Sequence, residues 1–179
     1  TGITLPASFC NMRNAPINTV PNINGCPGSQ ILVPLLVNGF TNITSATLRL
    51  EYDTTLVRYV SGSAAKPLVL PGMQITDSAV GGGSPRHKIR SRWSSSTPKS
   101  LSASDTLARF FFTDLTGNAA IAFNTTSGSG GDCEFVDENG NVMIDFPVST
   151  YYIDGSIQNK GLPAPGQVTG PISVCPGST

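Results

Sequence analysis

Residues 46–52 read ATLRLEY, so that apolar and polar side chains alternate at every position. Successive side chains of a strand point to opposite faces of a sheet, and this period of two therefore predicts a strand with one buried side. Leu48, Leu50 and Tyr52 fall on that side. A turn is predicted at residues 53–55, and a further strand begins at residue 56.

The same short period recurs along the chain, and no window of eleven residues carries the apolar stripe of a helix. Further strands are predicted at residues 30–37, 73–80, 88–93, 106–115, 119–123, 133–136, 142–146 and 151–157. Eight to ten short strands at this spacing predict an all-β protein, built as a β-sandwich or a jelly roll.

Length and charge exclude several classes of protein. The chain has 179 residues, which suits one ordinary domain. Lys and Arg together number 11, as do Asp and Glu, and nucleic acid is therefore not expected as a partner. The longest apolar run, at residues 31–37, is interrupted by Pro34 and is too short to span a membrane.

The four cysteines predict a secreted protein with disulfides. No pair has the C-x-x-C spacing of a zinc site, and the chain has a single histidine. Dispersed cysteines in a chain with only 12% charged residues are typical of an oxidising, extracellular environment. Buried thiols are the alternative.

A short repeat suggests the module boundaries. The sequence CPGS at residues 26–29 recurs at 175–178, and AP at 15–16 and Ile23 match at the same shift of 149 residues. We interpret residues 1–25 as a linker or the tail of a preceding module, 26–157 as the folded unit, and 158–179 as a linker and the start of the next repeat. Cys26 is then expected to pair with Cys133, the other cysteine of its unit. Cys10 remains, either as a thiol or as a partner of Cys175.

The order of several motifs resembles the cohesin domain. These motifs are ILVP at 31–34, LEYD at 50–53, TTLVRYV at 54–60 and DGSI at 154–157. More narrowly, CPGS at 26–29 and DCEF at 132–135 resemble cohesin-like modules of large secreted Bacteroidetes proteins. Thr54 stands where the family's turn usually carries proline.

The resemblance implies a nine-stranded β-sandwich with jelly-roll topology, related to family-3-type carbohydrate-binding modules. It also implies an extracellular or cell-surface location and a non-catalytic function, which in true cohesins is the binding of a dockerin module.

Catalysis is not expected from the residues themselves. His87, the single histidine, is flanked by Arg86 and Lys88, which cannot orient its imidazole as the acidic member of a triad does. No serine lies in a G-x-S-x-G motif, and the spacing of the carboxylates identifies no glycosidase pair. We therefore predict that the chain is not an enzyme and needs no cofactor.

An acidic segment at residues 132–141 allows two interpretations. Asp137, Asn139 and Asn141 alternate as they do in a calcium loop, so that Ca²⁺ is possible, although no bidentate glutamate follows. Alternatively, Asn139-Gly140 forms a tight hairpin turn and the carboxylates are simply solvated.

Basic residues are concentrated in the middle of the chain. On the strand predicted at 88–93, alternation sends Arg90 and Arg92 to one face, and Trp93 to the opposite, core-facing side. If Arg58 and Arg109 belong to the same sheet, a basic stripe crosses it and can recognise an acidic protein surface, with Tyr59 as an apolar anchor. A charged face that only keeps the sheet soluble is the alternative.

These observations predict a protein-interaction or adhesion module of a secreted, multi-modular scaffold. The alternative is a carbohydrate-binding module attached to a secreted polysaccharide-degrading enzyme, with a polysaccharide as the partner. A sugar binder requires a row of exposed aromatic side chains on one sheet, whereas a cohesin requires a flat sheet without such a row.

Overall fold

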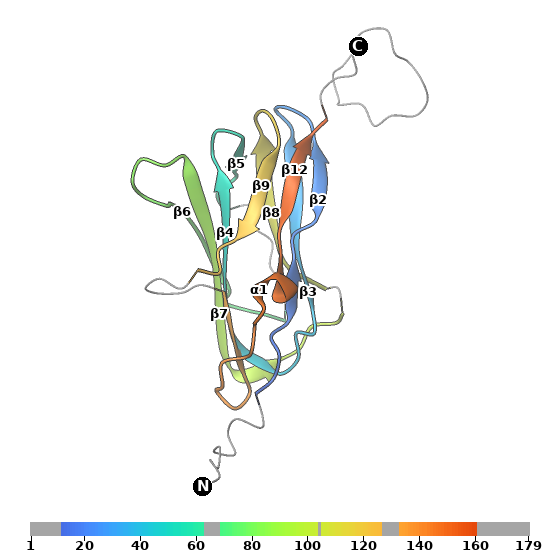
Figure 1. Cartoon of the computed structure of the whole chain (residues 1–179). Helices are drawn as coiled ribbons and strands as arrows, with labels where there is room; N and C mark the ends of the chain where they lie inside the picture. The colour runs from blue at the N-terminus through green and yellow to red at the C-terminus, as the bar shows by residue number, and fades with distance from the viewer. Residues whose placement is uncertain (1–11, 63–68, 104, 127–132, 161–179) are drawn as a thin grey trace.

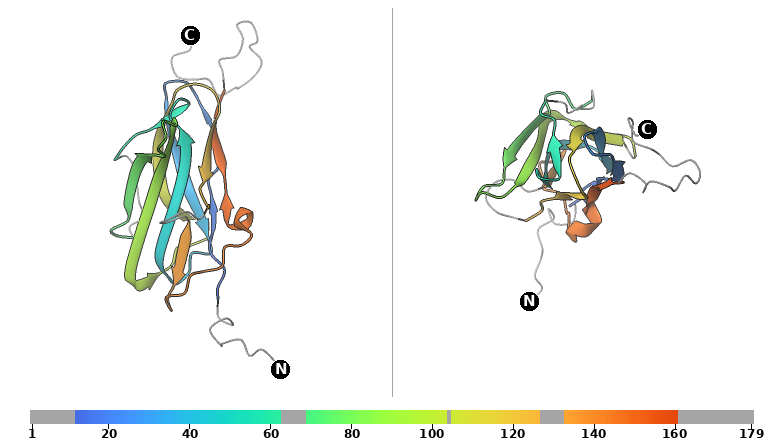
Figure 2. Two further views of the ribbon diagram at one scale, coloured as in Figure 1. Left: turned by 60° about the vertical axis from the view of Figure 1, so that its left-hand side comes forward. Right: turned by 90° about the horizontal axis from the view of Figure 1, so that it is seen from above.

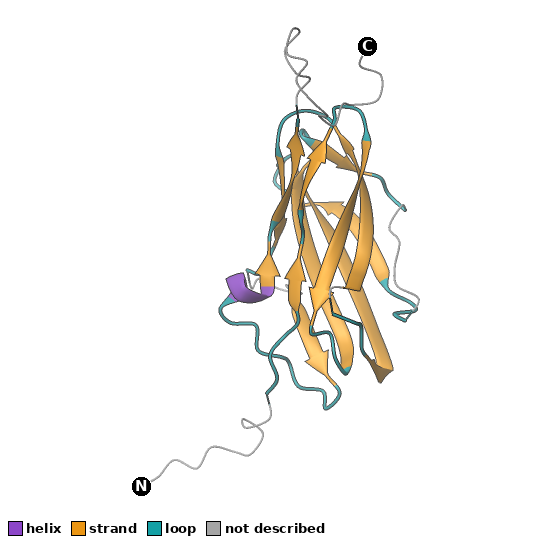
Figure 3. Ribbon diagram, turned by 90° about the vertical axis from the view of Figure 1, so that its right-hand side faces the viewer, coloured by secondary structure: helices purple, strands orange, loops and turns teal. Residues whose placement is uncertain are grey.

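The structure is a computed structural model that describes residues 12–62, 69–103, 105–126 and 133–160. Two β-sheets pack face to face, and their strands run along the long axis of the molecule (Figure 1). The only helix in the described ranges is α1 (Val148–Tyr151), a single turn at the side of the sandwich (Figure 3). The predicted all-β sandwich is therefore confirmed.

One sheet has five strands and the other has seven. The five-stranded sheet has the order β11 (Tyr152–Ile153), β1 (Ile17–Thr19), β3 (Gln30–Asn38), β8 (Asp105–Asp114) and β5 (Val57–Tyr59). The seven-stranded sheet has the order β2 (Asn22–Gly25), β12 (Gly155–Asn159), β9 (Ala119–Phe123), β4 (Ile43–Asp53), β7 (Arg86–Lys99) and β6 (Gln74–Ala79), with β10 (Glu134–Asp137) also paired to β4. The expected count of nine is thus approximate, because several of these strands have only two to four residues.

The hydrophobic core lies between the two sheets. Leu48 and Leu50 of β4 and Phe110 and Phe112 of β8 are at most 2% exposed. The alternation at residues 46–52 therefore has the expected orientation, and β4 lies beside the long strand β7 (Figure 2). Trp93 is also in the core, at 3% exposure, as the alternation of its strand predicts.

The folded unit begins before Cys26. Strand β1 pairs with β3 and, in parallel, with β11, and strand β2 pairs in parallel with β12. Asn18 of β1 is fully buried and Val20 is 2% exposed. Residues 17–25 are thus an integral part of the sandwich, and the expected boundary at residue 26 is too late. Residues 1–11 and 161–179, which include the second CPGS motif, lie outside the described ranges.

The predicted disulfide between Cys26 and Cys133 is wrong. Cys133 is a buried thiol whose Sγ lies 3.5 Å from the backbone nitrogen of Arg49 and 3.6 Å from the carbonyl oxygen of Asn124. Cys26 directly follows β2, which is separated from β4 in the sheet by β12 and β9. The two cysteines therefore belong to different parts of the sheet. Cys10 and Cys175 lie outside the described residues.

No helix in the described ranges is long and apolar enough to cross a membrane.

Candidate binding surface

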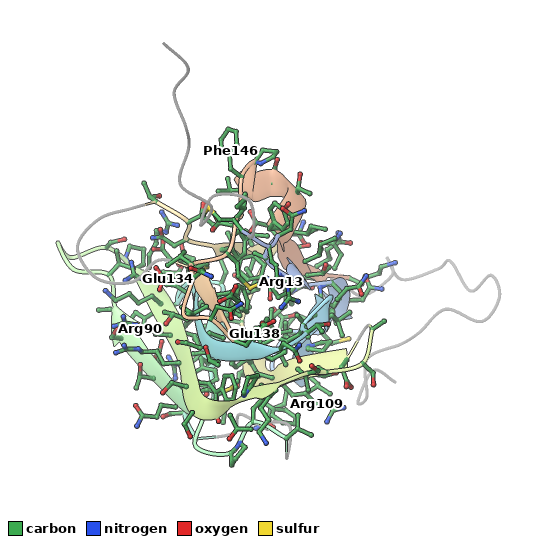
Figure 4. The ribbon with its side chains drawn as sticks, turned by 90° about the horizontal axis from the view of Figure 1, so that it is seen from below. Arg13, Arg90, Arg109, Glu134, Glu138 and Phe146 are labelled. Atoms are coloured by element: carbon green, nitrogen blue, oxygen red, sulfur yellow. The ribbon has the colours of Figure 1, made fainter. Side chains whose placement is uncertain are left out.

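The four arginines of the predicted stripe do not share one surface. Arg90 and Arg92 lie on β7 of the seven-stranded sheet, whereas Arg58 on β5 and Arg109 on β8 belong to the five-stranded sheet. Figure 4 shows that Arg90 and Arg109 point away from different sides of the molecule. The stripe is divided because the chain crosses between the sheets after β5, which carries Arg58, and again after β7, before the strand that carries Arg109.

Tyr59 cannot serve as an exposed anchor. It is 7% exposed, and its ring packs against Phe110 and Phe112 with centroid distances of 6.3 and 5.8 Å. Burial, together with the nearby negative charge of Asp77, raises the pKa of its hydroxyl. Tyr59 is therefore a core residue, and the predicted anchor role is wrong.

The seven-stranded sheet brings a third arginine to Arg90 and Arg92. Arg49 on β4 lies directly opposite Arg90 on β7, and Arg92 lies opposite Thr47. Burial and the charges of Arg92 and Arg49 lower the pKa of Arg90. We call Arg49, Arg90 and Arg92 the arginine cluster. The alternation places Arg49 on the polar side of its strand, but only the pairing register reveals that it meets Arg90.

A hollow of about 190 Å³ opens beside the arginine cluster. Its lining residues come from β4, β6 and β7 and from the turn before β6, and they are Ser45, Thr47, Gly72, Gln74, Arg92, Trp93 and Ser94. Arg92 is the single charged side chain in this lining. Most of the remaining lining groups are small or polar.

The other half of this face is nearly neutral. Glu51, with a side chain only 7% exposed, forms an ion pair of 2.6 Å with Arg86 and accepts a hydrogen bond from the Asn124 amide. Next to it, Ala120 and Ala122 of β9 line a second hollow of about 320 Å³. The outer face of β6, β7, β4 and β9 is thus basic on one side and lined by small side chains on the other.

The segment proposed as a calcium loop forms a hairpin turn. Asp137 is fully buried, and its Oδ1 accepts hydrogen bonds of 2.9 Å from the backbone N–H groups of both Asn139 and Asn141. The side-chain amide of Asn141 donates to Oδ2 at 3.4 Å. Within the described ranges, no group of three or more His, Cys, Asp or Glu side chains is arranged to hold a metal ion. The turn therefore accounts for the Asp137 carboxylate, and calcium binding here stays a prediction.

His87 takes part in a hydrogen-bonded group at the edge of the sandwich. Its Nδ1 lies 3.1 Å from Asp77 Oδ2, and the Tyr52 hydroxyl donates to Asp77 Oδ1 at 3.0 Å. Burial and this hydrogen bond raise the pKa of Tyr52. The group joins the edge strand β6 to β7 and β4, and within the described residues no serine or cysteine contacts His87 as a nucleophile would.

The sequence and the fold both resemble those of known proteins. A family model described as the cohesin domain matches residues 18–127, from β1 to beyond β9. The chain belongs to the cohesin domain family. No curated protein matches the chain.

Solved cohesin structures have the same fold at low sequence identity. The sixth cohesin of Acetivibrio cellulolyticus scaffoldin B, solved in complex with a Cel5 dockerin mutant, has a TM-score of 0.61 at 17% identity, over 82% of this chain and 100% of that chain. The type III cohesin of the Ruminococcus flavefaciens scaffoldin ScaE has a TM-score of 0.61 at 13% identity, over 88% and 93%. A non-cellulosomal cohesin from the archaeon Archaeoglobus fulgidus has a TM-score of 0.58 at 16% identity, over 80% and 90%.

Proposed function

We propose that this cohesin module is a non-catalytic, extracellular protein-binding unit of a secreted, multi-modular scaffold such as those of Bacteroidetes. Its partner is a dockerin-type module that presents an acidic surface. Family membership supports the class of partner, since the Acetivibrio cellulolyticus cohesin was solved with a dockerin bound. The identity to that cohesin is only 17%, so the chemistry of the partner depends on the residues of this chain and not on those of that cohesin.

The outer face of β6, β7, β4 and β9 is the observation that carries the proposal. It is an open sheet surface with many small and polar side chains, which suits a protein partner better than a small ligand, because small-molecule sites are mostly apolar clefts. Arg49 and Arg90 lie directly opposite each other, with Arg92 beside them. Arg92 is exposed, and no described carboxylate lies within ion-pair distance of it, so that a carboxylate of a partner can pair with it. Arg92 on this face therefore favours an acidic protein.

A carbohydrate-binding module is less well supported. Trp93, Tyr52 and Tyr152 are all at most 5% exposed, and none can stack on a sugar ring. Phe146 is 80% exposed, but it lies just before α1, outside the face described above (Figure 4). The described residues thus provide no row of aromatic side chains on this face, which planar polysaccharide binding requires.

The proposal can be tested with dockerin-type modules encoded in the same genome. Isothermal titration calorimetry with the unchanged chain should find at least one partner in the micromolar range or tighter. Arg90→Glu combined with Arg92→Glu should slow association several-fold at low salt and leave the melting temperature nearly unchanged. The matched control, Arg58→Glu with Arg109→Glu, carries the same charge change on the other sheet and should bind normally. The proposed function is wrong if no dockerin-type module binds. Equal loss in both double variants would instead place the contact elsewhere.

A further inference from the structure

The hollow beside the arginine cluster lies over three neighbouring strands. Gln74 on β6, Arg92 on β7 and Thr47 on β4 form one row across the sheet, because Gln74 pairs with Arg92 and Arg92 pairs with Thr47. Ser45 and Ser94 form the next pair on the same face. An arginine side chain is therefore surrounded by three hydroxyl groups and an amide.

Arg92 is not neutralised by an acidic side chain in the described part of the molecule. It is exposed, and no described carboxylate lies within ion-pair distance of it. Glu134 occupies the same row but lies beyond Thr47, opposite it on β10. The exposed charge of Arg92 consequently favours an anion in the hollow.

The strand beneath the hollow is anchored from its core side by Trp93. Trp93 is 3% exposed, and its indole Nε1 donates a hydrogen bond of 3.2 Å to the carbonyl oxygen of Pro71. Its ring packs against Phe40, with a centroid distance of 6.1 Å. Because this part of β7 is held by the core before binding, we expect little ordering of the protein when a ligand group enters.

We infer that this hollow receives one carboxylate side chain, aspartate or glutamate, of the bound protein, and that Arg92 determines specificity for it. A guanidinium group can bind a carboxylate through two parallel hydrogen bonds. The hydroxyls of Ser45, Thr47 and Ser94 are further donors. A glutamine or a neutral residue at the same position of the partner leaves the Arg92 charge desolvated without compensation. The inference rests on the proposed function, in that a protein partner covers this face.

The test uses a small probe and needs no partner protein. In a titration of the ¹⁵N-labelled chain with N-acetyl-L-glutamate, the backbone amide signals of Ser45, Thr47, Gln74 and Ser94 should shift together and saturate in the millimolar range. N-acetyl-L-glutamine should give no saturable shift at these residues. Arg92→Gln should weaken binding of the glutamate probe roughly tenfold, since a hydrogen bond to a charged group is lost. Arg109→Gln, on the opposite sheet, should bind as the unchanged chain does.

Two results would overturn the inference. One is an equal response to the glutamine probe, and the other is unaltered binding of the glutamate probe by Arg92→Gln. Failure of the proposed function gives a different result. In that case no dockerin-type module binds the chain, although its hollow still binds the glutamate probe. A dockerin-type partner that binds Arg92→Gln as tightly as the unchanged chain overturns the inference and leaves the proposed function in place.

Discussion

Arg49 on β4 lies directly opposite Arg90 on β7, so that two arginines form a cross-strand pair on the outer face of the seven-stranded sheet. Burial, together with the charges of Arg92 and Arg49, lowers the pKa of Arg90. The exposed Arg92 lies on the same face, where its charge can attract an oppositely charged partner.

Arg49→Gln should therefore slow association with an acidic partner and make the association rate less sensitive to salt. The effect arises because long-range attraction to the arginine cluster increases the frequency of productive encounters. Surface plasmon resonance between about 50 and 500 mM NaCl measures both the association rate and its salt dependence. Added salt shortens the range of electrostatic attraction, because the Debye length falls from about 10 Å at 0.1 M to about 3 Å at 1 M. Arg58→Gln on the other sheet is the control. If both variants have the same salt dependence, Arg49 does not contribute to the attraction.

Asp114 should make the module less stable as the pH rises. Its side chain is fully buried, neither carboxylate oxygen has a hydrogen-bond partner among the described residues, and burial raises its pKa. Gly25 lies so close that an added Cβ would be 2.6 Å from Asp114 Oδ2. Arg58, which follows the Asp114 partner Val57 on β5, is exposed, as is Lys160, whose backbone N–H donates to the Gly25 carbonyl oxygen.

The sign follows from proton binding. The folded state keeps the Asp114 proton to a higher pH than the unfolded state, whose pKa is about 3.9. Stability from this group is therefore complete below that value and is lost as the pH rises through the folded-state pKa. Melting temperatures from pH 3 to 8 should show Asp114→Asn gaining on the unchanged chain as the pH increases. The exposed Asp105 on the same strand provides the control, Asp105→Asn. A pH-independent difference between Asp114→Asn and the unchanged chain would contradict the prediction.

Asp137→Ala should destabilise the module by about 1–3 kcal/mol, because the backbone N–H groups of Asn139 and Asn141 lose their charged acceptor. Burial alone would raise the pKa of Asp137, but hydrogen bonds from Asn141 and Asn139 outweigh it and lower the pKa. The stability from this group is thus present at neutral pH and is lost as the pH falls. Urea denaturation at pH 7 and at about pH 2.5 measures both effects, because the loss begins only near the ordinary aspartate pKa of about 3.9 and grows below it.

The same turn predicts the response to metal removal. Since the Asp137 oxygens already accept hydrogen bonds from Asn139 and Asn141, EDTA should leave the melting temperature unchanged. A melting temperature that rises with millimolar Ca²⁺ in the unchanged chain, but not in Asp137→Ala, would instead support the calcium loop.

Gly155→Ala should destabilise the fold more strongly than substitution of any exposed glycine. A Cβ at this position would collide with the carbonyl oxygen of Val20 and would lie 2.6 Å from that of Pro21. These backbone atoms join β1 to β2 and cannot move aside without disturbing both strands. Gly62→Ala is a suitable control, because nothing lies within 4 Å of its Cβ position. At φ +75° it still carries the modest strain of a left-handed conformation. Similar melting temperatures for the two variants would show that the segment before Cys26 contributes little to the folded unit.

Local patterns in the sequence determined most of the longer strands and the direction of their side chains. The strand expected at residues 142–146, all of which the structure describes, is absent, and isolated bridges at Val142 and Ile144 stand in its place. The alternation at residues 46–52 and 88–93 correctly separates the core residues Leu48, Leu50 and Trp93 from the solvent-facing arginines. Side-chain direction in a strand depends only on the parity of the position, so neighbouring residues are enough to specify it. The family resemblance carried by the motifs is likewise confirmed by the family match.

Only the tertiary structure decided which strands are neighbours. It separated Arg58 and Arg109 from Arg90 and Arg92, and it placed Arg49 opposite Arg90. Strands β1 and β2 have three and four residues, too few for a recognisable period, and they are held by pairing with β11 and β12 far along the chain. The pairing of β10 with β4 places Cys133 next to Arg49, where it is a buried thiol. The spacing of the cysteines in the sequence does not record this position. Such pairings form between residues distant in sequence, and their register depends on the packing of the whole core, which no local pattern records.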